Sequence, residues 1–159
     1  MTSSLDEMFM NFAIGEALKA ADKGEVPVGA VLVGEDEKII SSAHNLCESL
    51  CDPTAHAEIL AIREAGRKLG NWRLTGTVLY VTLEPCVMCM GAVVLSRIKR
   101  VVFGTPDPKS GALVSVYTIG LDKKLNHTVE VRSGVLQDRC SSLLRDFFKR
   151  IREKSSNVV

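Results

Sequence analysis

Two short stretches of the chain carry residue types that bind a transition metal and transfer protons. His56 and Glu58 are separated by one residue, and Cys86 and Cys89 form a Cys-x-x-Cys pair directly after Pro85. Two thiolates and one neutral imidazole occupy three positions of a tetrahedral zinc ion and leave the fourth for water, which distinguishes a catalytic zinc site from a closed structural one. Glu58 is then the candidate group for moving protons between that water and a substrate.

The spacing of His56 and Glu58 places a condition on such a site. Two residues apart on an ideal helix are roughly 200° apart around its axis, so one side of a helix cannot present both. They converge only if the metal lies end-on at the first turn of the helix. A helix N-terminus also favours thiolate, because its unpaired N–H groups and its positive dipole end lower the pKa of a cysteine.

The residues alone leave other interpretations of the cysteines open. A Cys-x-x-Cys pair is also typical of redox sites and of zinc ribbons. A redox pair does not explain His-x-Glu at residues 56–58. A ribbon would need Cys47 and Cys51 as its second pair, which leaves His56 without a role. Cys47, Cys51 and Cys140 show no further metal-binding pattern and are predicted to act as small apolar residues.

Hydrophobic periodicity predicts the elements in the first part of the chain. Apolar residues recur at helical spacing over residues 5–22, and Ser4 with Glu7 fits a capping box at the start of this helix. Runs rich in β-branched residues predict strands over residues 28–33 and 38–43, joined by a charged loop. This part of the chain is therefore predicted to supply one helix and a two-stranded hairpin.

Helices and strands alternate over the rest of the chain. The predicted segments are, in order, a helix from 52 to about 69, a strand over 77–83, a helix over 86–95, a strand over 99–104, part of a helix over 115–124, a strand over 128–131 and a closing helix over 140–151. The alternation from residue 38 to residue 104 is typical of a parallel sheet with right-handed crossovers. The N-termini of the helices at 52 and 86 then lie at the carboxyl ends of the strands, where open α/β sheets bind their ligands.

Length and composition indicate one soluble domain over residues 1–159. Of the 159 residues, 46% are hydrophobic and 25% are charged, as in an ordinary globular domain. The formal net charge is +1, so a polyanionic partner would need a local basic patch. The longest apolar run, residues 85–95, is shorter than the roughly 18 residues that a membrane span needs. No signal-peptide pattern begins the chain, so the predicted location is the cytoplasm, with no membrane partner.

The joint signature of His-x-Glu and Pro-Cys-x-x-Cys resembles that of zinc-dependent base deaminases. More specifically, the chain is similar over about residues 8–152 to the bacterial-type tRNA-specific adenosine deaminases, in the cytidine-deaminase-like superfamily. The stretches that carry this resemblance are residues 24–30, 44–45, 52–58, 71–74, 79–90, 96–104, 126–127 and 146–148. The run Val-Thr-Leu-Glu-Pro-Cys-Val-Met-Cys at residues 81–89 is the most specific of them.

The resemblance implies a fold, a reaction and partners. The implied fold is of the α/β class, in three layers (α/β/α) around a mixed, mostly parallel five-stranded sheet. The implied reaction is hydrolytic deamination of adenosine to inosine at the wobble position of a tRNA anticodon, through attack of zinc-bound hydroxide on carbon 6 of adenine and loss of ammonia. One zinc ion per chain, a homodimer and a tRNA anticodon stem-loop as partner are implied in the same way.

The resemblance also assigns roles to individual residues. His56, Cys86 and Cys89 would bind zinc, and Glu58 would be the general acid and base. The residues implied to contact the flipped base or its neighbouring nucleotides are Asn45, Val28, Ala57, Asp107 and Lys109. From the residues alone, the asparagine is also explained as a turn or cap residue, and the aspartate and lysine as parts of a solvated loop.

A basic helix face favours an RNA partner. The residues of this RNA rim are Arg145, Lys149, Arg150 and Arg152, on the predicted closing helix. A second basic group is expected near the loop after residue 104, consisting of Arg97, Lys99, Arg100 and Lys109. Clusters of Lys and Arg are the footprint of phosphate contacts, although a basic helix face can also be merely solvated.

Two other functions would use many of the same residues. A deaminase of a free nucleobase or nucleoside, such as guanine or cytosine, needs the same zinc ligands and Glu58 but no basic rim. A catalytically silent, zinc-stabilised RNA-binding subunit needs the zinc ligands but no carboxylate beside them. Glu58 therefore argues against the silent subunit, and the RNA rim distinguishes the two deaminases.

Overall fold

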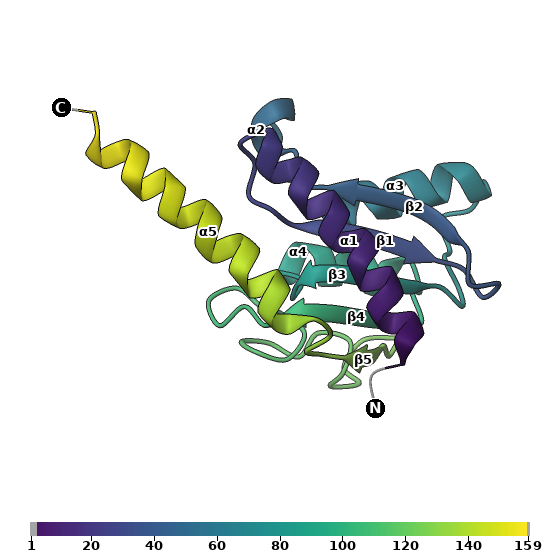
Figure 1. Cartoon of the computed structure of the whole chain (residues 1–159). Helices are drawn as coiled ribbons and strands as arrows, with labels where there is room; N and C mark the ends of the chain where they lie inside the picture. Colours follow the sequence, from purple (N-terminus) through teal and green to yellow (C-terminus); the bar gives the residue numbers. More distant parts are fainter. Residues whose placement is uncertain (1–2, 159) are drawn as a thin grey trace.

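A mixed five-stranded sheet forms the centre of the structure, a computed structural model that describes residues 3–158 (Figure 1). The strand order across the sheet is β2-β1-β3-β4-β5. The elements follow one another along the chain as α1 (Ser4–Asp22), β1 (Gly29–Val33), β2 (Ile39–His44), α2 (Cys47–Leu50), α3 (Ala57–Leu69), β3 (Val78–Leu83), α4 (Val87–Leu95), β4 (Arg100–Thr105), β5 (Glu130–Arg132) and α5 (Gln137–Ser156).

Four of the five strands point in the same direction. β1 pairs antiparallel with β2 on one side and with β3 on the other, whereas β3–β4 and β4–β5 are parallel pairs. The predicted alternation of strands and helices from residue 38 to residue 104 is confirmed as β2, α3, β3, α4 and β4, all three strands running the same way. β1 lies between β2 and β3, so the sheet is mixed, as the resemblance implied.

Helices cover both faces of the sheet, which confirms the three-layer α/β/α fold (Figure 1). α1 and the start of α5 lie on one face, where the buried side chains include Met10, Tyr80 and Val102. α3 and α4 lie on the other face, where Ala61 and Phe103 belong to the buried core. Both faces of the central strands are therefore buried, which explains the nearly continuous apolar runs of β1 and β4.

Two helix starts differ from the prediction. Ser3, not Ser4, caps α1, because its hydroxyl accepts a hydrogen bond from the backbone N–H of Asp6 at 3.1 Å. The second helix does not begin at residue 52. It begins at Ala57, after a turn in which the Asp52 carboxylate accepts the Thr54 backbone N–H at 2.8 Å. Such short polar side chains compete with helix formation by bonding to their own turn, a competition that apolar periodicity does not reveal.

The predicted helix over residues 115–124 is absent. The described chain forms turns there, held by long-range backbone bonds such as Ile119 N–H to the Ala112 carbonyl (2.9 Å) and Val129 N–H to the Gly120 carbonyl (2.9 Å). The closing helix is present and longer than predicted, because α5 spans Gln137–Ser156. Its C-terminal half extends beyond the body of the molecule (Figure 1).

The most apolar helix, α4, is a core helix of nine residues. Cys89, Met90 and Val93 are fully buried in it, against the sheet. Within residues 3–158, no helix has the length and apolar character needed to cross a membrane.

Candidate metal centre and adjoining cavity

The starts of α3 and α4 bring the metal-binding residue types together. His56 is the N-cap of α3 and Cys86 is the N-cap of α4, both with extended backbone, and Cys89 lies in the first turn of α4. β2 precedes α3 and β3 precedes α4, and these two strands end at the same edge of the sheet. A ligand held here would therefore lie end-on to both helices, as the spacing of His56 and Glu58 requires.

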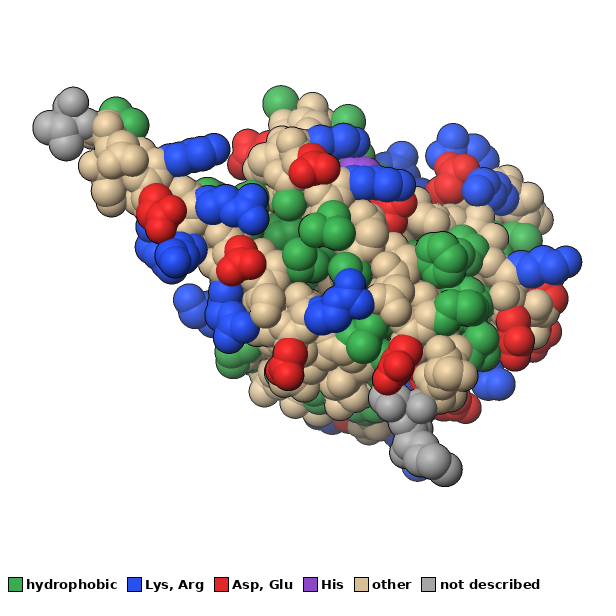
Figure 2. All heavy atoms as spheres, viewed as in Figure 1, with side chains coloured by type: hydrophobic (Ala, Val, Ile, Leu, Met, Phe, Trp, Pro, Cys, Tyr) green, Lys and Arg blue, Asp and Glu red, His purple; other side chains and the backbone are tan. Residues whose placement is uncertain are grey.

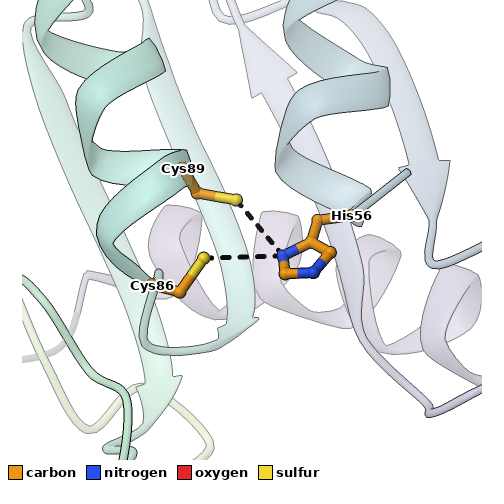
Figure 3. Close-up of side chains that lie close together, drawn as sticks. All are labelled: His56, Cys86 and Cys89. Carbon is orange, nitrogen blue, oxygen red and sulfur yellow. Dashed lines mark hydrogen bonds between the residues drawn. The ribbon is translucent and has the colours of Figure 1, made fainter. Parts of the chain in front are cut away.

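The distances between these side chains fit a tetrahedral zinc ion (Figure 3). His56 Nδ1 lies 3.5 Å from Cys86 Sγ and 3.6 Å from Cys89 Sγ. Zinc bonds of about 2.3 Å to sulfur and about 2.05 Å to nitrogen, at tetrahedral angles, separate S and N by about 3.6 Å. All three ligand atoms lie within 4.8 Å of one another, and they form the only such group among the residues described. The donor set and its spacing therefore suit zinc.

The protonation of the three side chains is already uneven in the protein alone. Hydrogen bonding from Cys89 and His56 lowers the pKa of Cys86 to about 4, so this sulfur is a thiolate at neutral pH. The same bond to Cys86, together with burial, raises the pKa of Cys89. The hydrogen bond to Cys86 raises the pKa of His56 as well. Binding of a metal ion would therefore release protons, because its ligands must be deprotonated.

Glu58 is a buried carboxyl group beside the metal-binding residues. It is the second residue of α3, two after the cap residue His56, and only 4% of it is exposed. Burial raises the pKa of Glu58, and hydrogen bonding to Cys89 opposes this effect. A carboxyl group with a raised pKa at a helix start can hold and release a proton near neutral pH, which suits general acid–base chemistry.

A cavity of about 360 Å³ opens beside these residues at the carboxyl edge of the sheet. Every stretch that lines it either precedes β1 or follows one of the strands β2, β3 and β4. The lining residues are Val26, Val28, Asn45, Cys47, His56, Ala57, Glu58, Leu83, Glu84, Cys86, Asp107 and Ser110. A mostly apolar hollow with a few polar groups at one end is typical of a small-molecule or base-binding site.

Comparison with known proteins identifies the family. Residues 3–105 match the model of the cytidine and deoxycytidylate deaminase zinc-binding region. The chain is 54% identical over 149 residues to the tRNA-specific adenosine deaminase of Bacillus subtilis (strain 168), covering 94% of this chain and 92% of that protein. The chain belongs to the tRNA-specific adenosine deaminase family.

Two solved structures show how widely the fold of this family is shared. One, from a study of A-to-I editing by tRNA:A34 deaminases at the wobble position of transfer RNA, has a TM-score of 0.83 and 43% identity, covering 86% of this chain and 99% of that one. Another is NE0047 in complex with 2,6-diaminopurine, with a TM-score of 0.78 and 27% identity over 89% of this chain and 80% of that one. The same architecture therefore also holds a free purine in a more distant protein.

Asn45, one of the residues that the family resemblance assigned to the base, lies at the cavity and is also tied to the backbone. Its amide nitrogen donates to the Val26 carbonyl at 3.3 Å, and its amide oxygen accepts the Cys47 backbone N–H at 3.3 Å. The second bond is the turn contact that the residue type alone suggested. The amide nitrogen carries two hydrogens, so one remains for another acceptor.

A larger groove of about 990 Å³ adjoins the cavity of this family member and shares Val26, Leu83, Asp107 and Ser110 with it. It runs between the loop after β4 and the helix α5. The basic residues that line it are Lys109, Arg145, Lys149 and Arg152. Figure 2 shows Lys and Arg side chains gathered along α5 where it leaves the body. Arg150, the remaining residue of the RNA rim, is exposed but does not line the groove.

The second basic group does not gather at the loop after residue 104. Arg100 pairs with the carboxylate of Asp6 at 3.0 Å, at the beginning of β4 and so at the opposite end of the sheet from the cavity. Arg97 donates to the Val94 carbonyl at 2.9 Å, at the end of α4. Lys109 alone of this group lines the groove. Nearness in sequence misled here, because a six-residue strand separates the two ends of the sheet.

Sequence reasoning missed two residues of the cavity wall in particular. Cys47 was predicted to be a bystander, yet it follows Asn45 closely and lines the cavity. Glu84 lies in the stretch that is most typical of this family, but no role was predicted for it. It is 2% exposed and accepts hydrogen bonds from the loop after β4. A carboxylate between an apolar strand and a Pro-Cys pair was the available signal, because buried charges require partners.

Proposed function

We propose that this protein is a zinc-dependent hydrolase that deaminates adenosine to inosine at the wobble position of a tRNA anticodon. The observation that carries the proposal is the placement of Glu58 beside the group of His56, Cys86 and Cys89, in a cavity that continues into a basic groove. The family, with its close tRNA-specific relatives, supports the choice of substrate.

His56, Cys86 and Cys89 would hold one zinc ion per chain. The ion, when bound, would supply the Lewis acidity that makes water a nucleophile at neutral pH. Glu58 would accept a proton from the attacking water and deliver it to the substrate, so that the 6-amino group leaves as ammonia. The raised pKa that burial gives Glu58 suits both halves of this transfer. Val28 and Ala57 would enclose the base, and the free hydrogen of the Asn45 amide would donate to a ring nitrogen.

The two hollows divide the RNA between them. A cavity of about 360 Å³ suits one base and not a stacked run of bases, so the target adenosine must be turned out of the loop to enter it. The adjoining groove would receive the flanking nucleotides, with Asp107 and Lys109 beside the target. Arg145, Lys149 and Arg152 would contact phosphates there. Arg150 would make a weaker contribution, because it lies off the groove.

A homodimer accounts for an apolar surface that the single chain leaves exposed. Val87 and Leu95 project from α4 with 51% and 69% of their surface exposed. The segment after β4 follows α4 closely, since the Ala112 N–H donates to the Pro85 carbonyl at 2.8 Å, and it adds further exposed apolar residues. We call the combined surface the α4 face; its residues are Val87, Leu95, Val114, Val116 and Tyr117. Exposed apolar patches of this kind mark protein interfaces. The predicted location, where tRNA is met, is the cytoplasm.

Inosine formation in an anticodon stem-loop tests the proposed reaction directly. Purified zinc-loaded protein is incubated with a stem-loop carrying adenosine at the wobble position and, as a control, with one carrying adenosine only elsewhere in the loop. Conversion at the wobble position alone is expected. Release of ammonia from free guanine or cytosine, with no conversion of the stem-loop, would replace the proposal with free-base deamination.

Variants of α5 separate the RNA enzyme from a free-base enzyme. Lys149→Gln with Arg152→Gln removes two groove-lining charges and is expected to raise KM for the stem-loop and to lower the slope of its dependence on salt concentration by about two, or about one per phosphate contact. Arg150→Gln is the matched control on the same helix, and it is expected to change KM little. Equal effects of both changes would contradict the groove as the RNA path.

A further inference from the structure

Glu84 is a buried carboxylate without a cationic partner near the metal centre. It directly follows β3 and is 2% exposed. Its hydrogen-bond donors all come from the segment after β4. They are the backbone N–H groups of Asp107 (3.1 Å), Leu113 (3.2 Å), Val114 (2.9 Å) and Ser115 (3.0 Å) and the hydroxyl of Ser115. No further buried side-chain N or O atom in the described part of the chain lacks a partner. The chain thus neutralises this buried charge with backbone dipoles alone.

The two oxygens of Glu84 hold different parts of the segment. Oε2 accepts the N–H groups of Leu113, Val114 and Ser115, whereas Oε1 accepts the N–H of Asp107 and the Ser115 hydroxyl. Only an ionised carboxylate offers acceptors in both directions, since a glutamine has one oxygen and one donor group. The carboxylate therefore closes the segment from 107 to 115 into a loop around itself.

The loop approaches Glu84 so closely that Gly111 has no space for a side chain. A Cβ on Gly111 would overlap the carboxylate of Glu84. The loop is also fixed at its base, because the Glu84 N–H donates to the Thr105 carbonyl at 2.9 Å and the Ala112 N–H donates to the Pro85 carbonyl at 2.8 Å. Residues 84–86 thus hold the loop and the metal-binding Cys86 in one rigid frame.

The loop that Glu84 holds forms part of both hollows. Asp107 and Ser110 line the cavity and also line the groove, and Lys109 lies between them in the groove wall. Within the loop, the Asp107 side chain accepts the N–H groups of Lys109 (3.0 Å) and Ser110 (3.2 Å), so the position of Asp107 sets the positions of both. The bond from the Asp107 N–H to Glu84 is therefore the link between the loop and the frame at the point nearest the substrate.

We propose that Glu84 is a positioning residue that sets where the cavity ends and the groove begins, by holding Asp107 and its loop at a fixed distance from the metal centre. This inference rests on the proposed function in so far as the substrate is an RNA whose flanking nucleotides occupy the groove. Glu84 does not contact the substrate in this role. It acts through Asp107, so its loss weakens the binding of the flanking nucleotides more than it slows the chemical step.

Glu84→Gln tests the role at atomic level. The glutamine oxygen can keep the three donors at 113–115, which leaves its NH₂ group facing the N–H of Asp107, and two donors cannot pair. In zinc-loaded full-length protein, the Asp107 amide is expected to exchange with deuterium at least about tenfold faster, while the zinc content stays that of the wild type. KM for the anticodon stem-loop is expected to rise about tenfold, with kcat changed less than about threefold.

Asp6→Asn is the matched control. Asp6 is another buried carboxylate, 1% exposed, but it binds Tyr80 and two arginines at the opposite end of the sheet. It is expected to lower stability without changing KM or the exchange of Asp107. An equal rise in KM in this variant would show that the effect of Glu84→Gln is general destabilisation, and it would overturn the proposal. Unchanged exchange at Asp107, or a fall in kcat with unchanged KM, would overturn it too.

Ser115→Ala decides the question if Glu84→Gln does not fold. It removes one donor to Oε1 and keeps the backbone intact, so a rise in KM of about threefold and faster exchange at Asp107 are expected. Unchanged values of both would contradict the positioning role. If the wild type leaves the stem-loop unconverted, the proposed function fails, and the exchange of Asp107 alone then decides whether Glu84 holds the loop.

Discussion

Glu58 can act beside the metal-binding group because of the residue at which α3 begins. His56 lies outside the helix as its N-cap, with extended backbone, and Glu58 is only the second helical residue. If the helix began at residue 52, as the sequence pattern predicted, these two side chains would point roughly 200° apart. The residues of the centre could thus be predicted from the sequence, whereas their convergence depends on a turn at residues 52–54 that apolar periodicity does not detect.

Glu58→Gln is expected to keep wild-type zinc content and to lower kcat by about 10²–10⁴-fold, the usual contribution of a general acid–base group. The amide has nearly the shape of the carboxyl group but cannot take a proton from water and pass it on. Zinc analysis with single-turnover kinetics on the stem-loop measures both quantities. Glu64→Gln, on the same helix and paired with Arg67 at the surface, is the control and should retain full activity. Undiminished turnover in Glu58→Gln would exclude it as the proton carrier.

At the scale of elements, a buried charge network fixes α1 to the sheet. The Asp6 carboxylate accepts hydrogen bonds from the Tyr80 hydroxyl (2.9 Å) on β3, from Arg100 (3.0 Å) on β4 and from Arg132 (3.0 Å) on β5. Burial alone would raise the pKa of Asp6. The hydrogen bonds from Tyr80 and Arg100 and the charges of both arginines outweigh burial and hold the pKa below 3.8. One side chain thereby connects a helix to three strands.

The depressed pKa of Asp6 gives the stability of the protein a defined dependence on pH. Because the folded state binds this proton more weakly than the unfolded chain, the contribution is present above the unfolded pKa of about 3.8 and is lost as the pH falls through the lower folded value. Asp6→Asn is expected to reduce the free energy of unfolding by about 1.5–3 kcal/mol at pH 7. Urea denaturation at pH 7 and at pH 3 should show this difference shrinking at the lower pH. A difference that is the same at both values would contradict the assigned role.

Elements with a clear period were predictable, and elements fixed by distant partners were not. The apolar spacing of α1, β3 and α4 gave their positions within a few residues. The segment from 106 to 129 has no such period, because its shape follows from bonds to Glu84 and to other backbone groups far away in the chain. A helix predicted at 115–124 was therefore wrong. The donors that a helix would pair locally are in part used by a carboxylate some thirty residues earlier.

At the scale of the whole molecule, the sheet places every functional stretch at one edge. The strands β2, β3 and β4 all end there, and β1 begins there after running in the opposite direction. Alternation of strands and helices predicted the common direction of the three strands. It could not reveal that β1 is inserted between β2 and β3, because the hairpin pairing of β1 leaves its second edge free to pair with any strand. Through this insertion, residues 26–28 become part of the cavity wall.

The α4 face lies on the side of the molecule opposite to α1 and α5, so a second copy docked there would leave the basic helix of each chain uncovered. Two active sites and two RNA grooves could then work in one particle. Leu95→Glu places a charge on this face, where burial without a partner is costly, and is expected to weaken the dimer by at least about 100-fold. Sedimentation velocity over a range of protein concentrations measures the change.

The control for this prediction is Leu18→Glu, a substitution at a similarly exposed leucine, on α1 and so on the other face of the sheet. It should sediment as the wild type does. Because α4 also carries Cys89, zinc content is measured on every variant, so that dissociation is not confused with loss of the metal centre. A wild-type protein that sediments as a monomer at all concentrations would contradict the dimer. Dissociation caused equally by both substitutions would place the interface elsewhere than on the α4 face.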